Sequence, residues 1–250
     1  MALRLDKYLA ELGVGTRSEI KKLIRAKQVT VNGETATKPE LRLDETDEVC
    51  LRGKRLTYTA YEYYLFHKPA GCVSATEDAI HPTVLDYLSD TLRHDLFPVG
   101  RLDIDTEGLL LITNDGALAH RLLAPTRHVP KTYYAKVAGV VTGEDVRRFA
   151  EGIDIGEKKL TKPSKLVILS AAKCAEEEEV SEVKLTITEG KFHQVKRMFH
   201  SVGKEVLYLK RIAMGSLVLP DDLASGEYRP LTEEELAGLR ELAGIQAKNR

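Results

Sequence analysis

The chain has 250 residues, with 37 lysine and arginine residues against 38 aspartate and glutamate residues, so its formal net charge is −1. Hydrophobic residues make up 43% of it and charged residues 30%, which favours one large or two unequal folded domains over a disordered chain. The longest apolar runs are too short to cross a bilayer, and three scattered cysteines predict neither a disulfide framework nor a metal site. We therefore expect a cytoplasmic protein with no membrane partner.

The near-zero net charge hides two basic segments. Residues 1–30 hold seven basic and three acidic side chains, and residues 191–211 hold six basic and one acidic. Two such segments in a neutral chain can form a one-sided positive surface that attracts phosphate groups. For either segment alone, charged helix faces that are exposed to water are the favoured explanation.

The first part of the chain predicts two short helices followed by a small sheet. Apolar residues at helical spacing predict a helix over residues 3–12. Thr16 and Glu19 have the spacing of a capping box, which predicts the start of a second helix. Residues 29–31 are typical of a strand, and the Asn-Gly pair at 32–33 predicts a tight hairpin turn.

This arrangement resembles the S-four-like RNA-binding domain, or αL motif, of a ribosomal protein and tyrosyl-tRNA synthetases. The matching strings are LDKYL, TRS and VTVNG, at residues 5–33. The resemblance implies that Arg17, Lys21 and Lys22 contact RNA phosphates. The alternative is that they are ordinary surface charges that increase solubility. We assign this module to residues 1–59.

Residues 60–242 are predicted to form an α+β domain. Strands are expected at residues 63–66, 108–113, 131–137, 165–169 and 183–187, and helices at residues 83–87, 116–123, 143–151, 193–202 and 232–242. Because the strands do not alternate regularly with the helices, we expect a mostly antiparallel mixed sheet with flanking helices. Residues 243–250 are expected to be a flexible tail.

A loop rich in glycine and charge stands out at residues 100–108, with the sequence GRLDIDTEG, directly before an apolar strand. A buried strand would hold such a loop rigidly, and Arg101 could lie near a carboxylate and keep it ionised. The spacing does not choose between Asp103 and Asp105, and an ordinary tight turn explains the same residues. The sequence has no Gly-rich phosphate loop, no metal-ligand spacing and no Gly-x-Ser-x-Gly motif.

The string GRLD followed by T-x-GLLL resembles the signature of pseudouridine synthases, and the similarity continues at residues 67–71, 131–133 and 189–198. Such enzymes isomerise uridine in RNA without a cofactor or a metal. The resemblance implies that Asp103 is the catalytic carboxylate and that Lys196 pairs with it, although many relatives have arginine at this position.

The resemblance assigns further roles in a catalytic cleft that receives the flipped target base. It implies that Tyr133 stacks on the base and assists proton transfer, unless it is simply an aromatic side chain of the core. Arg101, His193, Gln194 and Arg197 are implied RNA contacts. For Lys196 and Arg197, the alternative is a phosphate contact or plain solvation.

The order of an S-four-like module followed by this domain resembles the RsuA branch of the family. Four segments resemble the members that act on the small ribosomal subunit, namely residues 81–85, 160–163, 193–197 and 226–235. The resemblance implies a monomer that modifies one uridine of 16S ribosomal RNA, with a partly assembled small subunit as its partner. The alternatives are a 23S ribosomal RNA enzyme of the same branch, a tRNA-directed enzyme, and a non-catalytic RNA-binding assembly factor.

Overall fold

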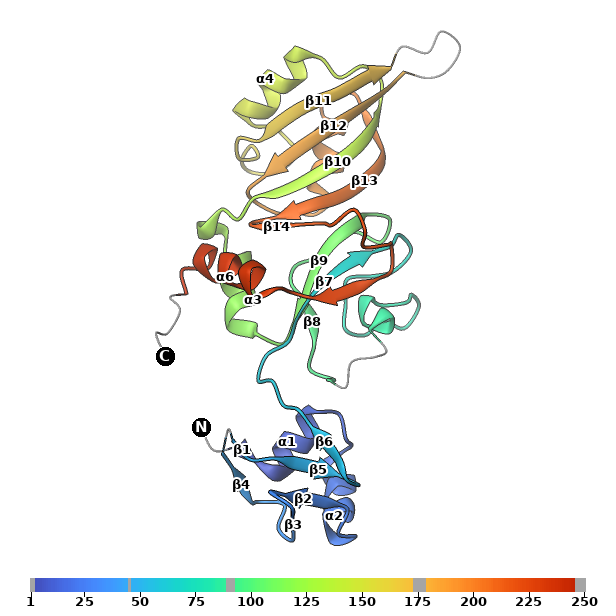
Figure 1. Ribbon diagram of the computed structural model, residues 1–250. Coiled ribbons are helices and arrows are strands. Elements are labelled where there is room, and N and C mark those ends of the chain that lie inside the picture. The colour runs from blue at the N-terminus through green and yellow to red at the C-terminus, as the bar shows by residue number, and fades with distance from the viewer. Residues whose placement is uncertain (1–2, 45, 89–92, 173–178, 246–250) are drawn as a thin grey trace. The chain divides into compact units, whose positions relative to one another are not determined.

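The computed structural model describes residues 3–44, 46–88, 93–172 and 179–245. It contains two compact units, which Figure 1 shows with their elements labelled. The first unit comprises Met1–Glu62 and Leu88–Leu96, and the second comprises Tyr63–Tyr87 and Phe97–Arg250. Among the described residues, no helix is both long enough and apolar enough to span a membrane.

The first unit has two helices and two small sheets. Its elements are β1 (Leu3–Arg4), α1 (Leu5–Glu11), α2 (Arg17–Arg25), β2 (Val29–Val31), β3 (Glu34–Thr35), β4 (Arg42–Leu43), β5 (Val49–Leu51) and β6 (Lys54–Leu56). One sheet has the order β3-β2-β5-β6, and β1 pairs with β4. The apolar sides of both helices pack on the sheet, with Leu5, Leu9, Ile20 and Ile24 almost fully buried. This packing makes the unit a separate small core.

Local signals in the sequence decide where these elements begin and turn. The Thr16 hydroxyl accepts a hydrogen bond from the Glu19 amide, and the Glu19 carboxylate accepts one from the Thr16 amide, so the expected capping box is confirmed. Asn32 and Gly33 both have positive φ angles, 52° and 83°, and they connect β2 with β3 as the hairpin signal predicted.

Leu88 and residues 93–96 belong to the first unit, although the sequence analysis placed them in the α+β domain of residues 60–242. Arg93 explains this assignment, because its guanidinium group donates a hydrogen bond of 2.8 Å to the Thr59 carbonyl oxygen. The same group lies over the Tyr58 ring and is bonded to Asp95. Such a contact between residues far apart in the chain gives no local sequence signal.

The second unit is built on a long, mixed sheet with the order β11-β12-β10-β13-β9-β7-β15, and β8 and β14 pair with its strands. Its strands are β7 (Tyr63–Lys68), β8 (Phe97–Pro98), β9 (Glu107–Thr113), β10 (Lys131–Ala138), β11 (Lys165–Ala172), β12 (Val180–Ile187), β13 (Glu205–Met214), β14 (Leu217–Val218) and β15 (Tyr228–Pro230). All of these pairs are antiparallel except β13 with β9. The expected mostly antiparallel α+β fold is therefore confirmed.

The helical elements of this unit are η1 (Val84–Tyr87), α3 (Gly116–Leu123), η2 (Pro125–Arg127), α4 (Gly143–Glu151), α5 (Gln194–His200) and α6 (Glu233–Leu242). Helix α4 packs against β11, α5 packs against β13, and α3 lies beside α6 (Figure 1). The Asp115 side chain caps α3 by accepting a hydrogen bond from the Leu118 amide.

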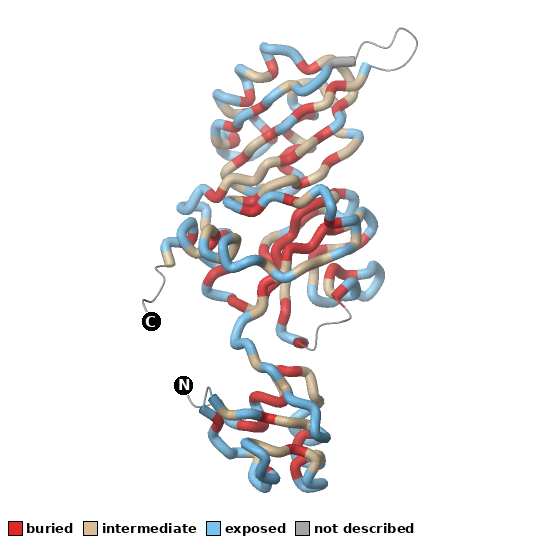
Figure 2. Tube along the Cα trace, viewed as in Figure 1, coloured by how far each residue is buried: buried red, intermediate tan, exposed pale blue. Residues whose placement is uncertain are grey.

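The core of this unit is densest around β7 and β9, where Figure 2 shows consecutive buried residues. Strand β9 is buried from Gly108 to Thr113 because it lies between β7 and β13 and is covered by apolar side chains of α3 and α6. A loop that leads into such a strand has one end fixed.

The later part of the second unit differs from the sequence-based expectation in two ways. Strand β13, with ten residues, was not predicted, because its apolar and polar residues do not alternate regularly. Ala243 was expected to begin a flexible tail, but it is fully buried in the core, where it continues the packing of α6. Residues 246–250 of the expected tail lie outside the described residues.

Candidate active site

Asp103 lies in the loop between β8 and β9, and its neighbour Leu102 is fixed by Ser74. The Ser74 hydroxyl donates to the Leu102 carbonyl oxygen and accepts from the Leu102 amide, both at 3.0 Å. Ser74 and Leu102 are both buried, which shields these two hydrogen bonds from water. The residue before Asp103 is therefore held on both its backbone groups.

The residues after Asp103 are held by Lys68 and Gly71. The Lys68 ammonium group donates to the carbonyl oxygens of Thr106 at 2.9 Å and Ile104 at 3.3 Å, and the Gly71 amide donates to Ile104 at 2.7 Å. Lys68 is completely buried, and this burial lowers the pKa of its ammonium group, although nearby carboxylates oppose the shift. The loop is thus attached to residues 68–74 on both sides of Asp103.

Gly108 allows the loop to join β9 in contact with β13. Its φ angle is +107°, and a Cβ atom at this position would lie 2.2 Å from the Arg211 carbonyl oxygen. Only glycine fits this approach without movement of the backbone. Arg211 also donates a hydrogen bond of 2.7 Å from Nε to the Leu109 carbonyl oxygen, which fixes the two strands at the end of the loop.

The side chain of Asp103 lies beside two groups from the start of α5. The Lys196 ammonium nitrogen is 3.6 Å from Asp103 Oδ2, and His193 Nε2 is 3.6 Å from Asp103 Oδ1. Asp103 is partly accessible, with 29% of its side chain exposed. A carboxylate that is fixed by its backbone, flanked by a cation and open to solvent on one side is suited to react with a bound molecule.

Lys196 makes its hydrogen bonds with Asp105. Its ammonium group donates to both Asp105 carboxylate oxygens, at 2.6 and 2.7 Å. Burial alone would raise the pKa of Asp105, but the hydrogen bonds and charge of Lys196 outweigh it and hold that pKa below its ordinary value. The expected ion pair between Lys196 and Asp103 is thus the longer of two, at 3.6 Å. Together, Asp103, Asp105 and Lys196 form one cluster of charged side chains.

Arg101 takes a different position from the one that its charge suggested. It is exposed, and no carboxylate of the described residues lies within ion-pair distance of it. Lys196, which comes from a segment 91 residues after Asp105, is instead the cation beside the two aspartates. Arg101 is therefore open to solvent at the edge of the loop.

Tyr133 lies in β10 and is aligned with the Asp103 loop across β13. It pairs with Arg211 of β13, and Arg211 pairs with Gly108 of β9. Because neighbouring strands are about 5 Å apart, Tyr133 lies roughly 10 Å from the end of the loop across the sheet. Its ring is mostly buried, and its hydroxyl group makes no hydrogen bond to any residue that the structure describes.

Gln194 and Arg197, which were expected to contact RNA, are engaged within the protein. The Gln194 amide accepts from the Lys191 amide and donates to Glu189, and the residue is buried. The Arg197 guanidinium group is bonded to Glu157 and to the carbonyl oxygens of Ile155 and Phe192. These contacts orient the segment that carries His193.

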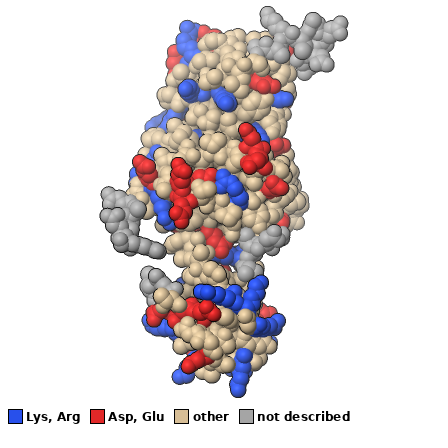
Figure 3. Space-filling model, in the orientation of Figure 1, with Lys and Arg blue, Asp and Glu red and all other residues tan. Residues whose placement is uncertain are grey.

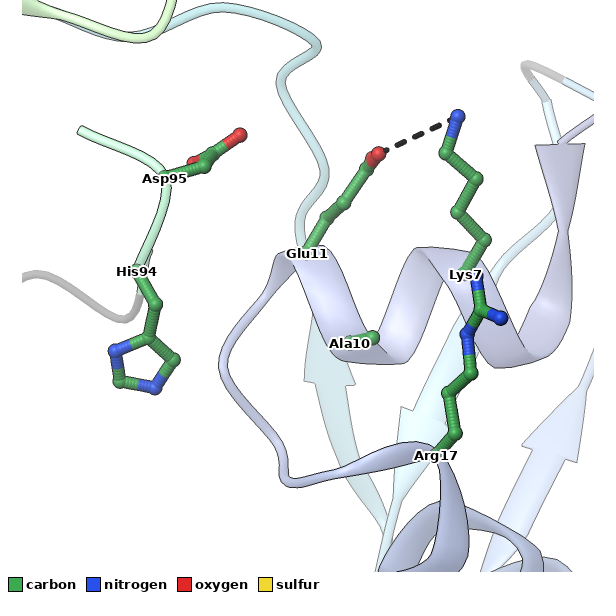
Figure 4. A pocket seen from close by; sticks show the side chains of 6 residues that line it. All are labelled: Lys7, Ala10, Glu11, Arg17, His94 and Asp95. Atoms are coloured by element: carbon green, nitrogen blue, oxygen red, sulfur yellow. Dashed lines mark ion pairs between the residues drawn. The ribbon is translucent and has the colours of Figure 1, made fainter.

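The first unit presents the three basic residues that the sequence singled out. Arg17, Lys21 and Lys22 are all exposed on α2, and Figure 3 shows several lysine and arginine side chains on this unit. Arg17 also lines a cavity of about 310 Å³ together with Lys7, Ala10, Glu11, His94 and Asp95. In Figure 4, Lys7 points toward Glu11, and the two form an ion pair of 3.6 Å.

Comparison with known proteins identifies both parts of the chain. Residues 62–201 match the family model described as RNA pseudouridylate synthase, and residues 3–49 match the S4 domain. The chain belongs to the RNA pseudouridylate synthase family. As a pseudouridine synthase it is an enzyme of the isomerase class, preceded by an S4 domain.

Relatives of this pseudouridine synthase match it over nearly its full length. A Bacillus subtilis protein, named as an uncharacterized RNA pseudouridine synthase, is 46% identical and covers 96% of this chain and 99% of its own. The ribosomal small subunit pseudouridine synthases A of Yersinia pestis and Escherichia coli K12 are 42% and 41% identical, over 95% of this chain and 98% and 100% of theirs. A crystal structure of a pseudouridylate synthase superposes with a TM-score of 0.66 at 40% identity, over 95% of this chain and 100% of that chain. These similarities place the synthase in the RsuA branch.

Proposed function

We propose that this synthase isomerises one uridine of 16S ribosomal RNA to pseudouridine and that Asp103 is its catalytic carboxylate. The position of Asp103 carries the catalytic part, since its neighbours Leu102 and Ile104 are bonded to residues 68–74 while its side chain stays accessible. The choice of RNA rests on the 41–42% identity to two small-subunit enzymes over almost the entire chain.

The reaction moves one bond and requires no co-reactant. The bond from the ribose C1′ atom to the uracil N1 atom breaks, and a bond from C1′ to C5 forms. The proton that leaves C5 is balanced by the proton that N1 gains, so nothing is oxidised or reduced. Asp103 supplies the carboxylate that attacks either the sugar or the base.

Three further residues assist Asp103 in this reaction. Lys196 stabilises the negative charge that the two aspartates share, since it lies within 3.6 Å of both. Tyr133 stacks on the flipped uracil and assists proton transfer through its unpaired hydroxyl group. Arg101, which is exposed, contacts the RNA and helps to displace the base from its stack.

The S4 domain increases the affinity for RNA through the exposed side chains of Arg17, Lys21 and Lys22 on α2, which contact RNA phosphates. We further propose that the protein acts in the cytoplasm as a monomer. Its substrate is a partly assembled small subunit, in which the target uridine is still accessible.

Two other targets fit the same chemistry. A 23S ribosomal RNA synthase of the same branch would keep both domains, and a tRNA-directed enzyme would keep the catalytic loop. A non-catalytic assembly factor is less consistent with the chain, because pure RNA binding has no use for Asp103 held by buried hydrogen bonds.

The test is to incubate the protein with 16S, 23S and tRNA transcripts and with a partly assembled small subunit, and to map pseudouridine in each by carbodiimide modification and primer extension. We expect one new pseudouridine in 16S RNA, with the assembled particle converted faster than naked transcript. Modification confined to 23S RNA or tRNA would contradict the proposed target. No modification of any of the substrates would contradict the proposed activity.

A further inference from the structure

An exposed aromatic ring lies next to the cluster of Asp103, Asp105 and Lys196. Phe192 has 73% of its surface exposed, and one face of its ring stacks on His193 with a centroid distance of 3.8 Å and an angle of 18°. His193 in turn lies 3.6 Å from Asp103. A single imidazole ring therefore separates an open phenyl face from the carboxylate expected to be catalytic.

The Phe192–His193 stack is held in place by its backbone. His193 has a left-handed conformation, with φ of +48°, at the residue that precedes α5. Arg197 donates a hydrogen bond of 3.1 Å to the Phe192 carbonyl oxygen, and buried Gln194 accepts one of 2.9 Å from the Lys191 amide. Because the segment is already ordered, binding to the open face of the ring costs little conformational entropy.

Several basic side chains come from the segments around the stack. The Lys191 ammonium group is 3.5 Å from the Lys159 carbonyl oxygen, so the exposed residues Lys158 and Lys159 lie near the same segment. Glu157 balances only part of this charge, through its ion pairs with Lys191 and Arg197. A flat apolar ring among lysines matches the chemistry of a nucleobase attached to phosphates more closely than that of an apolar protein surface.

We propose that Phe192, supported by His193, is the stacking platform for one nucleobase, that of the nucleotide next to the isomerised uridine. This inference rests on the proposed function, because it requires an RNA substrate at Asp103. When the target uridine leaves its stack, the neighbouring base loses a stacking partner, and the phenyl ring replaces it. The platform thereby favours the RNA conformation in which the uridine can reach Asp103.

The first test is to compare Phe192→Ala, Phe192→Leu and Phe192→Tyr with wild type in binding and single-turnover assays on the partly assembled small subunit. We expect both the alanine and the leucine variants to bind about tenfold more weakly, since neither offers a π face, and the tyrosine variant to bind like wild type. Val218→Ala is the matched control, because Val218 is also an exposed apolar residue, at 63%, and lies in a different element, β14. It should bind like wild type.

The second test replaces single nucleotides around the target with 5-iodouridine and maps photo-crosslinked peptides by mass spectrometry. We expect a crosslink to Phe192 from one nucleotide directly beside the target uridine. Wild-type binding by both Phe192→Ala and Phe192→Leu would overturn the platform, and so would wild-type binding by Phe192→Leu alone, which would mean ordinary apolar packing. Crosslinks from the nucleotides beside the target that reach only other segments or ribosomal proteins, and never Phe192, would also contradict the platform.

The two proposals fail in different ways. If wild-type protein forms no pseudouridine in any RNA, the proposed function fails. If wild type forms it and the Phe192 variants behave like Val218→Ala, only the stacking platform fails.

Discussion

Both carboxylate oxygens of Asp105 accept hydrogen bonds from the ammonium group of Lys196, at 2.6 and 2.7 Å. Asp105 is the more exposed of the two aspartates, with 63% of its side chain accessible, and Asp103 lies 3.6 Å from the same ammonium group. Lys196 is therefore shared. The contact of Lys196 with Asp103 therefore competes with the Lys196–Asp105 ion pair, which is shorter and more exposed to water.

Replacing Lys196 with methionine tests whether this shared cation accelerates the isomerisation step. Lys196→Met retains most of the apolar stem and removes the charge, so the single-turnover rate at saturating enzyme should fall by about a hundredfold, with a much smaller change in RNA affinity. Lys196→Arg should keep part of the rate, because the charge is retained while the head-group geometry changes. A normal saturated rate for Lys196→Met, reached only at higher enzyme concentration, would make Lys196 a phosphate contact.

Ser74 should influence catalysis through the position of the loop. Ser74→Ala removes the acceptor of the buried Leu102 amide and should lower the free energy of unfolding by about 1–3 kcal/mol. It should also lower the single-turnover rate, because the residue before Asp103 is no longer fixed. Ser164→Ala is the control, since Ser164 is also buried and donates to a carbonyl oxygen, that of Phe149. Equal rate losses in the two variants, measured alongside urea unfolding, would mean that only general stability matters.

The basic face of α2 should determine the salt dependence of RNA binding. If Arg17, Lys21 and Lys22 contact phosphates, replacing all three with glutamine should weaken binding by about 1 kcal/mol or more per contact. The slope of log affinity against log salt should decrease by about 0.7–0.9 for each lost contact. The matched control replaces three exposed basic residues outside α2 with glutamine, namely Lys38, Arg42 and Lys54. An identical effect in the control would mean that net charge, and not the α2 face, controls binding.

Tyr63 should contribute to stability at alkaline pH. Burial, together with its hydrogen bond to Asp115, raises the pKa of Tyr63 to about 12 from an ordinary 10.0. The folded protein thus holds this proton more tightly than the unfolded chain, so the associated stability is complete below pH 10 and is lost as the pH rises toward 12. Urea unfolding between pH 9 and pH 11 should show a smaller loss for Tyr63→Phe than for wild type. The exposed Tyr61 provides the control, and the idea fails if Tyr61→Phe changes the pH dependence as much as Tyr63→Phe.

The sequence predicted elements whose signals are local. The capping box at Thr16 and Glu19 and the Asn32-Gly33 turn each involve residues within three positions of one another, and both are present. Helix and strand periodicity likewise placed β9 and β10 within one residue of their observed limits.

The contacts that fix the loop could not be predicted in this way. Lys68 reaches Thr106 across 38 positions, and Ser74 reaches Leu102 across 28, so neither contact produces a spacing pattern. Lys68 lies in the segment at residues 67–71 that resembles the family, and its complete burial is an exception to the usual exposure of lysine. The preference of Lys196 for Asp105 depends on side-chain geometry, which sequence spacing does not specify.

The measurement that tests the central claim most directly is the single-turnover conversion of 16S RNA in the partly assembled small subunit by Asp103→Asn, compared with Asp105→Asn. The account predicts that Asp103→Asn loses activity by more than about a hundredfold while its RNA affinity stays within a few-fold of wild type. Asp105→Asn should lose much less, because Lys196 stays beside Asp103. Wild-type turnover by a folded Asp103→Asn protein would contradict the account.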